Sequence, residues 1–123
     1  GELGAGKTCL AQGLLWGLGA DDYARSPSFV LVSQYHDGRL TLYHIDLYRL
    51  SVPEEAFELG LDEYLYGDGV CVIEWANRVP GLFSEKHLDV RIDRLGESTR
   101  RLMMSTEDSK YSSVLSAVRS NVR

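Results

Sequence analysis

Apolar residues recur at three- and four-residue intervals in two segments, near the start of the chain and at its end. In the first segment this spacing predicts a helix over Lys7–Leu18, which ends before Gly19 because glycine readily adopts the left-handed backbone of a helix C-terminus. In the second it predicts a helix over Ser109–Val122. Between them, Ser51 and Glu54 form a capping box that predicts the start of a shorter helix.

Strand patterns occupy much of the remaining chain. The β-rich segments Phe29–Tyr35 and Leu40–Asp46 are separated by an Asp-Gly turn, so they are predicted to pair as an antiparallel hairpin. The continuous apolar run Val70–Ile73 is typical of a fully buried strand. His87–Arg94 and Arg101–Met104 flank another turn and suggest a second hairpin. Helices mixed with strands predict an α/β sandwich around one mixed, partly parallel sheet.

Composition narrows the class of protein. The 123-residue chain has 13 Lys and Arg against 18 Asp and Glu, a formal net charge of −5. This balance argues against a general nucleic-acid-binding surface but leaves open work on RNA through a partner. With 44% hydrophobic residues we expect one domain over 1–123, in which 105–123 form a C-terminal helix or tail. No run approaches the roughly 20 apolar residues that span a bilayer. Cys9 and Cys71 are isolated, which predicts reduced thiols in a cytoplasmic protein.

The first eight residues carry the most specific chemistry. They fit the phosphate-binding pattern G-x-x-x-x-G-K-[ST], called Walker A. Its glycines let backbone N–H groups curl around an anion, and the following helix turns its positive end to the phosphates. The Lys7 amine is then expected at the β- and γ-phosphates and the Thr8 hydroxyl at Mg²⁺. The alternative is a glycine-rich turn before an ordinary helix.

This motif sets the predicted fold as P-loop NTPase-like, a three-layer sandwich with a mixed sheet. A phosphate loop normally follows a buried central strand. Since the sequence begins inside the motif at Gly1, we expect a further N-terminal segment that contains at least this strand.

Two carboxylates that end strands are candidates for the rest of the site. Glu74 ends the Val70–Ile73 strand and is the favoured second Mg²⁺ ligand, with a simple surface carboxylate as the alternative. Asp46 is expected to orient water or touch the metal shell, or else to cap a turn. His44 shares its face and is interpreted as a satisfied, partly buried histidine rather than a catalytic base. Trp75 is interpreted as core or subunit-contact packing rather than a platform on which a base stacks.

Five motifs in order resemble the TsaE (YjeE) family of small bacterial ATPases of tRNA threonylcarbamoyladenosine synthesis. They lie between Gly1 and about Met104. The motifs are Gly1–Thr8, Ser26–Phe29, His44–Arg49, Glu58–Tyr64 and Val72–Ala76.

The resemblance implies ATP and Mg²⁺ as ligands, a slow ATPase activity, and a complex with the proteins TsaD and TsaB that the ATPase resets between cycles of modification at position 37 of tRNA. By matching positions, the resemblance implies that Lys7 and Thr8 hold the phosphates and Mg²⁺ and that Glu74 ligates Mg²⁺. It also implies that Asp46 is needed for hydrolysis and that Lys7 is a catalytic residue as well as a phosphate ligand. Ser26–Phe29 corresponds to a switch-like loop. The residues expected to contact the nucleotide are Gly1, Gly4, Ala5, Gly6, Lys7, Thr8, Cys9 and Ser28.

This chain departs mildly from the family at two of those positions. Ser28 stands where members often have Thr, and Cys9 where they often have Thr or Ser. Two other readings stay open. A small-molecule or nucleotide kinase also begins with a phosphate loop, although no Arg-rich lid is evident between Arg49 and Val70. The other reading is a nucleotide-gated binding module without enzymatic activity.

Overall fold

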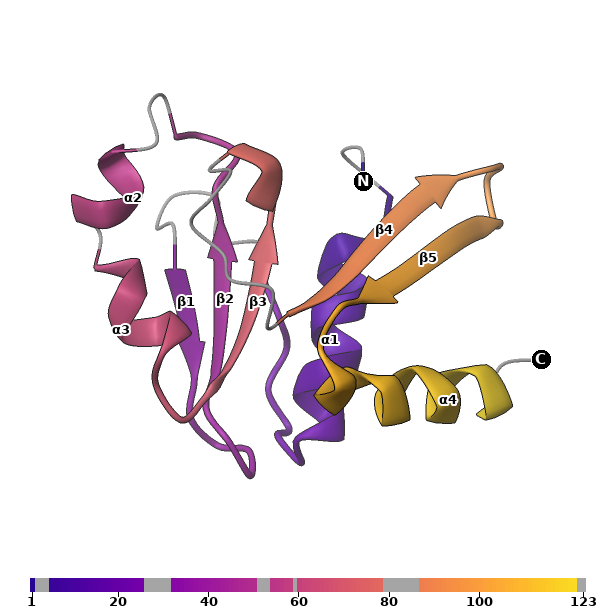
Figure 1. Ribbon diagram of the computed structural model, residues 1–123, viewed down its shortest axis with the longest axis horizontal. Helices are drawn as coiled ribbons and strands as arrows, with labels where there is room; N and C mark the ends of the chain where they lie inside the picture. The colour runs from indigo at the N-terminus through magenta and orange to yellow at the C-terminus, as the bar shows by residue number, and fades with distance from the viewer. Residues whose placement is uncertain (2–4, 26–31, 51–53, 59, 79–86, 122–123) are drawn as a thin grey trace. The chain divides into compact units, whose positions relative to one another are not determined.

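The computed structural model describes residues 1, 5–25, 32–50, 54–58, 60–78 and 87–121. Its contacts divide the chain into two compact units. The sheet unit is Gly6–Pro80, and the hairpin unit combines Gly1–Ala5 with Gly81–Arg123. Each unit has its own secondary structure, shown in Figure 1.

A three-stranded mixed sheet forms the centre of the sheet unit. Its strands are β1 (Val32–Tyr35), β2 (Leu42–Asp46) and β3 (Val70–Glu74), in the order β1-β2-β3. β1 and β2 are antiparallel, which confirms the predicted hairpin for the described residues; 29–31 lie outside them. β2 and β3 are parallel and in register from Leu42↔Val70 to Asp46↔Glu74, so the predicted mixed sheet is also confirmed. The parallel pairing brings the two predicted carboxylates to the same end of the sheet.

Helices cover both faces of this sheet (Figure 1). On one face lies α1 (Lys7–Gly17), as predicted, because its apolar stripe packs against the sheet. The cluster at this contact comprises Leu15, Leu18, Ala20, Tyr35 and Leu42, with Ala24, Val70 and Val72 packed against it. The opposite face meets α3 (Leu61–Leu65), where the rings of Tyr43 and Tyr64 lie 4.8 Å apart. The unit also contains α2 (Glu54–Glu58) and the short 3₁₀ helix η1 (Ala76–Arg78), while Ser51 of the predicted capping box lies outside the described residues.

Burial along β3 corrects one prediction. Val70–Ile73 was expected to be fully buried, but these residues are half-buried and only Glu74 at the end of the strand is buried. The reason is position, because within the described residues β3 pairs with β2 on a single edge. The central strand is β2, in which Leu42, His44 and Ile45 are fully buried.

The hairpin unit contains the second predicted hairpin. β4 (Leu88–Arg94) and β5 (Arg100–Thr106) are antiparallel and are followed by the 3₁₀ helix η2 (Ser109–Tyr111) and α4 (Ser112–Asn121). The C-terminal helix is therefore confirmed. One sheet had been expected to include both hairpins; β4 and β5 instead form a separate two-stranded sheet, because neither pairs with β1, β2 or β3.

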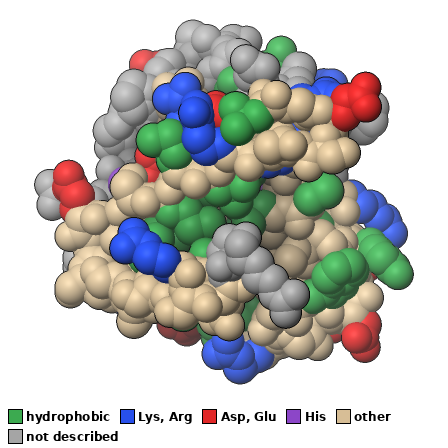
Figure 2. Space-filling model, turned by 90° about the vertical axis from the view of Figure 1, so that its right-hand side faces the viewer, with side chains coloured by type: hydrophobic (Ala, Val, Ile, Leu, Met, Phe, Trp, Pro, Cys, Tyr) green, Lys and Arg blue, Asp and Glu red, His purple; other side chains and the backbone are tan. Residues whose placement is uncertain are grey.

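Many apolar side chains of the hairpin unit are open to solvent. Leu95, Leu102, Met103 and Val114 are all exposed, and α4 has no buried residue among those described. Figure 2 shows, in green, hydrophobic side chains that are open to view at the surface. None of the described helices is long and apolar enough to cross a membrane.

Candidate functional site

A glycine with a left-handed backbone precedes α1. Gly6 precedes the helix with φ of +113°, a conformation that side chains with a Cβ rarely adopt, and its carbonyl accepts the first helical hydrogen bond from Leu10 N–H at 3.1 Å. No side chain of the described residues caps this end of the helix. Lys7, Thr8 and Cys9 form its first turn, where backbone N–H groups lack intrahelical partners and the helix dipole is positive.

Asp46 and Glu74 end the two parallel strands side by side. They are direct neighbours in register, and Leu47 N–H donates to the Glu74 carbonyl at 3.1 Å, which ties the strand ends together. Asp46 Oδ1 accepts from Tyr48 N–H at 2.9 Å, so this carboxylate also stabilises the turn after β2. Both readings of Asp46, as a turn-capping residue and as a site residue, therefore suit its position.

The Lys7 side chain reaches these strand ends. Its amine lies over the ring of Trp75, 3.8 Å from the ring centroid, and Tyr48 packs on the same indole at 5.0 Å between centroids. Burial lowers the pKa of Lys7, whereas the nearby Glu74 and Asp46 carboxylates act to raise it. The structure thus brings together Lys7, Asp46 and Glu74, three residues that are far apart in the sequence.

A buried hydrogen bond connects Glu74 to the centre of the sheet. His44 Nε2 lies 2.5 Å from Glu74 Oε2, with the histidine fully buried and the glutamate 8% exposed. The other ring nitrogen, Nδ1, has no hydrogen-bond partner within the described part of the chain. The prediction of a partly buried His44 is therefore wrong, since the ring is fully buried, and among the described residues only Nε2 has a hydrogen-bond partner.

Other predicted site residues are placed differently. Gly1 and Ala5 belong to the hairpin unit, where a Cβ on Gly1 would meet the Ile92 carbonyl oxygen and the Ala5 carbonyl accepts from Arg100 Nε at 2.9 Å. Gly4, Ser28 and the remainder of the Ser26–Phe29 loop lie outside the described residues. Thr8 is half-buried and Cys9 is exposed in the first turn of α1.

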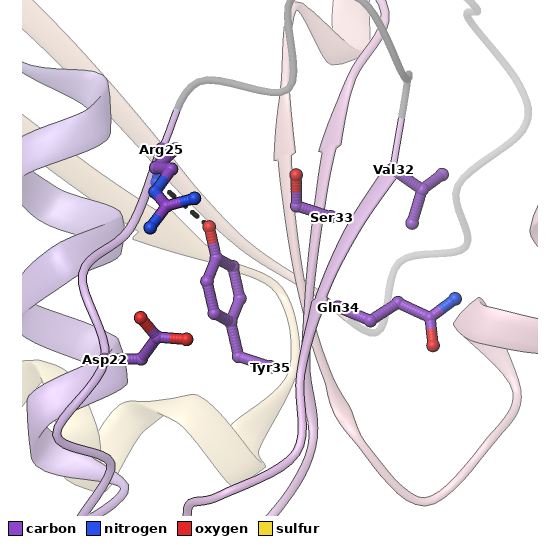
Figure 3. A pocket seen from close by; sticks show the side chains of 6 residues that line it. All are labelled: Asp22, Arg25, Val32, Ser33, Gln34 and Tyr35. Carbon is purple, nitrogen blue, oxygen red and sulfur yellow. Dashed lines mark hydrogen bonds between the residues drawn. The ribbon is translucent and has the colours of Figure 1, made fainter.

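A separate hollow of about 320 Å³ opens at the edge strand β1 (Figure 3). Its lining consists of Asp22, Arg25, Val32, Ser33, Gln34 and Tyr35. The Tyr35 hydroxyl accepts from Arg25 N–H at 2.9 Å across it. Its described lining includes none of those sequence-predicted site residues that the structure describes, and it lies at β1 rather than at the ends of β2 and β3.

Sequence reasoning gave too little weight to Trp75 and His44. Trp75 was interpreted as core or subunit packing, but its ring is the surface on which the Lys7 amine rests. It also has φ of +61°, which is unusual for a bulky side chain. The only sequence signal for either contact was proximity to a strand-end carboxylate, because both contacts join segments that the fold alone brings together.

These features define a mixed α/β protein with a charged site at the carboxyl ends of two parallel strands, beside the start of a helix. The family model described as "Threonylcarbamoyl adenosine biosynthesis protein TsaE" matches residues 1–102. This match covers more than half of the chain, and the chain therefore belongs to the TsaE family.

Individual relatives agree with this assignment. The tRNA threonylcarbamoyladenosine biosynthesis protein TsaE of Bacillus subtilis (strain 168) is 40% identical over 90% of this chain and 69% of its own length. The protein of that name from Treponema pallidum (strain Nichols) is 45% identical over 85% of this chain and 77% of its own length. For that from Haemophilus influenzae (strain ATCC 51907 / DSM 11121 / KW20 / Rd) the identity is 42%, and this chain spans 59% of its length. The crystal structure of YdiB from Bacillus subtilis matches with a TM-score of 0.79 and 34% identity, over 97% of this chain and 72% of that one.

Proposed function

We propose that this chain binds and hydrolyses ATP with Mg²⁺, as a P-loop ATPase that supports the formation of N6-threonylcarbamoyladenosine at position 37 of tRNA. The observation that carries the proposal is the meeting of the Lys7 amine with the Asp46 and Glu74 carboxylates at one end of the sheet. A cation beside two carboxylates, next to the start of a helix, is the set of groups that phosphoryl transfer to water requires.

Phosphate binding falls to the start of α1 in this proposal. Gly6 gives the backbone its left-handed turn, and the N–H groups of Lys7, Thr8 and Cys9 are oriented along the positive end of the helix. Lys7 leaves the Trp75 ring to contact the β- and γ-phosphates. Gly1, Gly4, Ala5 and Ser28 complete the nucleotide contacts by their match to the family motifs.

The donor set suits Mg²⁺. Thr8 supplies a hydroxyl and Glu74 a carboxylate, both hard oxygen ligands, and Mg²⁺ in nucleotide sites takes one or two protein ligands beside phosphate and water. Within the described residues no three His, Cys, Asp or Glu side chains lie close enough to hold a metal by themselves. The proposed site therefore depends on the nucleotide for its remaining ligands. When bound, Mg²⁺ would neutralise charge that develops on the β- and γ-phosphate oxygens.

Hydrolysis needs a group that orients the attacking water, and Asp46 takes this role in the proposal. One of its oxygens holds the turn through Tyr48 N–H, which fixes the carboxylate against rotation. The second oxygen can then accept a hydrogen bond from water. Lys7 stabilises the negative charge of the transferring phosphoryl group.

The partners in this proposal are TsaD and TsaB, with tRNA reached only through their complex. The net charge of −5 agrees with an indirect role toward RNA. Hydrolysis would be slow in the isolated chain and faster with both partners. It would reset the complex rather than transfer the threonylcarbamoyl group.

The decisive experiment measures ATP turnover of the chain with and without TsaD and TsaB. We expect stimulation by the partners, and a loss of about 100-fold or more in turnover for Asp46→Asn and Glu74→Gln, because each removes a group that acts in the transition state. Asp46→Asn should still bind ATP. The matched control is Asp89→Asn in β4, which should turn over ATP like the parent. Parental turnover in both site variants, or phosphate passed to a small acceptor in place of water, would refute the proposal.

A further inference from the structure

The sheet unit buries two polar side chains among its described residues, and they bind each other. His44 is fully buried in the central strand β2, and Glu74 is 8% exposed at the end of β3. Residues two positions apart in a strand share a face of the sheet. His44 therefore points to the same face as Leu42, and Glu74 to the same face as Val72, which is the face that packs against α1. Their side-chain atoms Nε2 and Oε2 lie 2.5 Å apart and form a buried hydrogen bond.

The hydrogen-bond partners of the ring decide its tautomer. A proton on Nε2 is donated to Glu74 Oε2, and the buried Nδ1 then carries only a lone pair. A proton on Nδ1 would bury an N–H group with no acceptor in the described residues, which costs more than an unused lone pair. We therefore assign Nε2 as the donor of this hydrogen bond.

Packing alone does not explain a histidine at this buried position. A leucine of similar size would fill the position without leaving a buried nitrogen unsatisfied, which costs about 1–3 kcal/mol. What the histidine adds is a fixed donor to one oxygen of Glu74. The gain is therefore expected at the carboxylate rather than in the core.

We propose that His44 is a positioning residue for Mg²⁺ binding, which holds Glu74 in one orientation through Oε2 and reserves Oε1 for the ion or a water molecule of its shell. The proposal rests on the proposed function, in which Glu74 ligates Mg²⁺. Partners of this kind orient metal-binding carboxylates, and their removal typically costs 10- to 100-fold in metal affinity. Glu74 would then act as a ligand through one oxygen only.

The experiment measures how Mg²⁺ changes the affinity for a fluorescent ADP analogue, with EDTA as the metal-free condition. In His44→Leu we expect a loss of about tenfold or more in apparent Mg²⁺ affinity, with unchanged binding in EDTA. His44→Gln, whose amide keeps an N–H donor, should recover most of that loss. Ile45→Val is the matched control, because it removes a methylene from the neighbouring, fully buried position of β2 without touching Glu74.

A second measurement needs neither variant nor metal. In protein labelled with ¹⁵N-histidine, the His44 ring should show the Nε2–H tautomer with a slowly exchanging, strongly downfield proton. An Nδ1–H tautomer, or a Mg²⁺ dependence in His44→Leu equal to that of the parent, would overturn the positioning role while the proposed function stands. Absence of Mg²⁺-dependent nucleotide binding in the parent would remove the proposed function itself, and the positioning role with it.

Discussion

The two units differ in how far their apolar side chains are buried. The sheet unit buries Leu15, Leu42, Ile45, Leu47 and Leu61 completely, because helices cover both faces of its sheet. Among the described strand and helix residues of the hairpin unit, only Ile92 is buried. The same alternating and helical patterns are present in both, so pattern predicts which elements form but not how much core they share.

The units also differ in charge. The sheet unit has 11 Asp and Glu against 5 Lys and Arg, whereas the hairpin unit has 7 against 8. Lys7 and the start of α1, which bind phosphate in the proposal, thus lie in the acidic unit. Binding a polyanion there depends on local groups, the α1 N–H groups and Lys7, since the net charge of the unit opposes it.

The largest expected effect tests the difference in burial. Leu42→Ala should lower the free energy of unfolding by about 2–5 kcal/mol, because it leaves a cavity at a fully buried position. Leu102→Ala, at a side chain that is 47% exposed, should cost less than about 0.5 kcal/mol. Urea unfolding followed by circular dichroism measures both variants.

Tryptophan fluorescence sharpens the same experiment. Trp16 and Trp75 both belong to the sheet unit, so their fluorescence follows the unfolding of that unit. A shift of the fluorescence transition with Leu42→Ala but not with Leu102→Ala is the expected result. Equal losses of stability in the two variants would contradict the contrast between the units.

An intermediate effect concerns the glycines of α1. Gly13 is helical and exposed, with open space around a Cβ built on it, so Gly13→Ala should raise the free energy of unfolding by about 0.5–1 kcal/mol. Gly6→Ala serves as the opposite control, because φ of +113° strains any residue with a Cβ and predicts a loss of about 1–3 kcal/mol. Thermal unfolding of both variants gives the signs; a gain at Gly6 would show that the left-handed turn is absent.

The smallest effect belongs to the hairpin surface. A hydrogen bond from Arg101, aided by the charge of Arg91, holds the pKa of Asp93 below its ordinary value of 3.8. Because the pKa is lower in the folded state, the contribution to stability is present above pH 3.8 and is lost as the pH falls through the folded value. Asp93→Asn should therefore lower the Tm slightly at neutral pH, and the difference from the parent should shrink below about pH 3.8. A difference that grows at low pH would contradict this sign.

The features that the sequence predicts correctly are those that depend on residues close together in the chain. Helix α1, both hairpins and the strand-end positions of Asp46 and Glu74 follow from spacing and turn residues that act over a few positions. The half-buried state of β3 and the bond between His44 and Glu74 could not be found that way. Both depend on which strands become neighbours, because the register of β2 with β3 brings His44 and Glu74 together from 30 positions apart.

At Trp75, backbone strain and the contact with Lys7 favour different residues. Its left-handed backbone, at φ of +61°, costs roughly 1–3 kcal/mol for a residue with a bulky side chain. Glycine would relieve that strain but would remove the ring under the Lys7 amine. Selection for stability would therefore favour glycine at position 75, whereas selection for the contact with the Lys7 amine would favour tryptophan. A variant stabilised at this position would lose that contact.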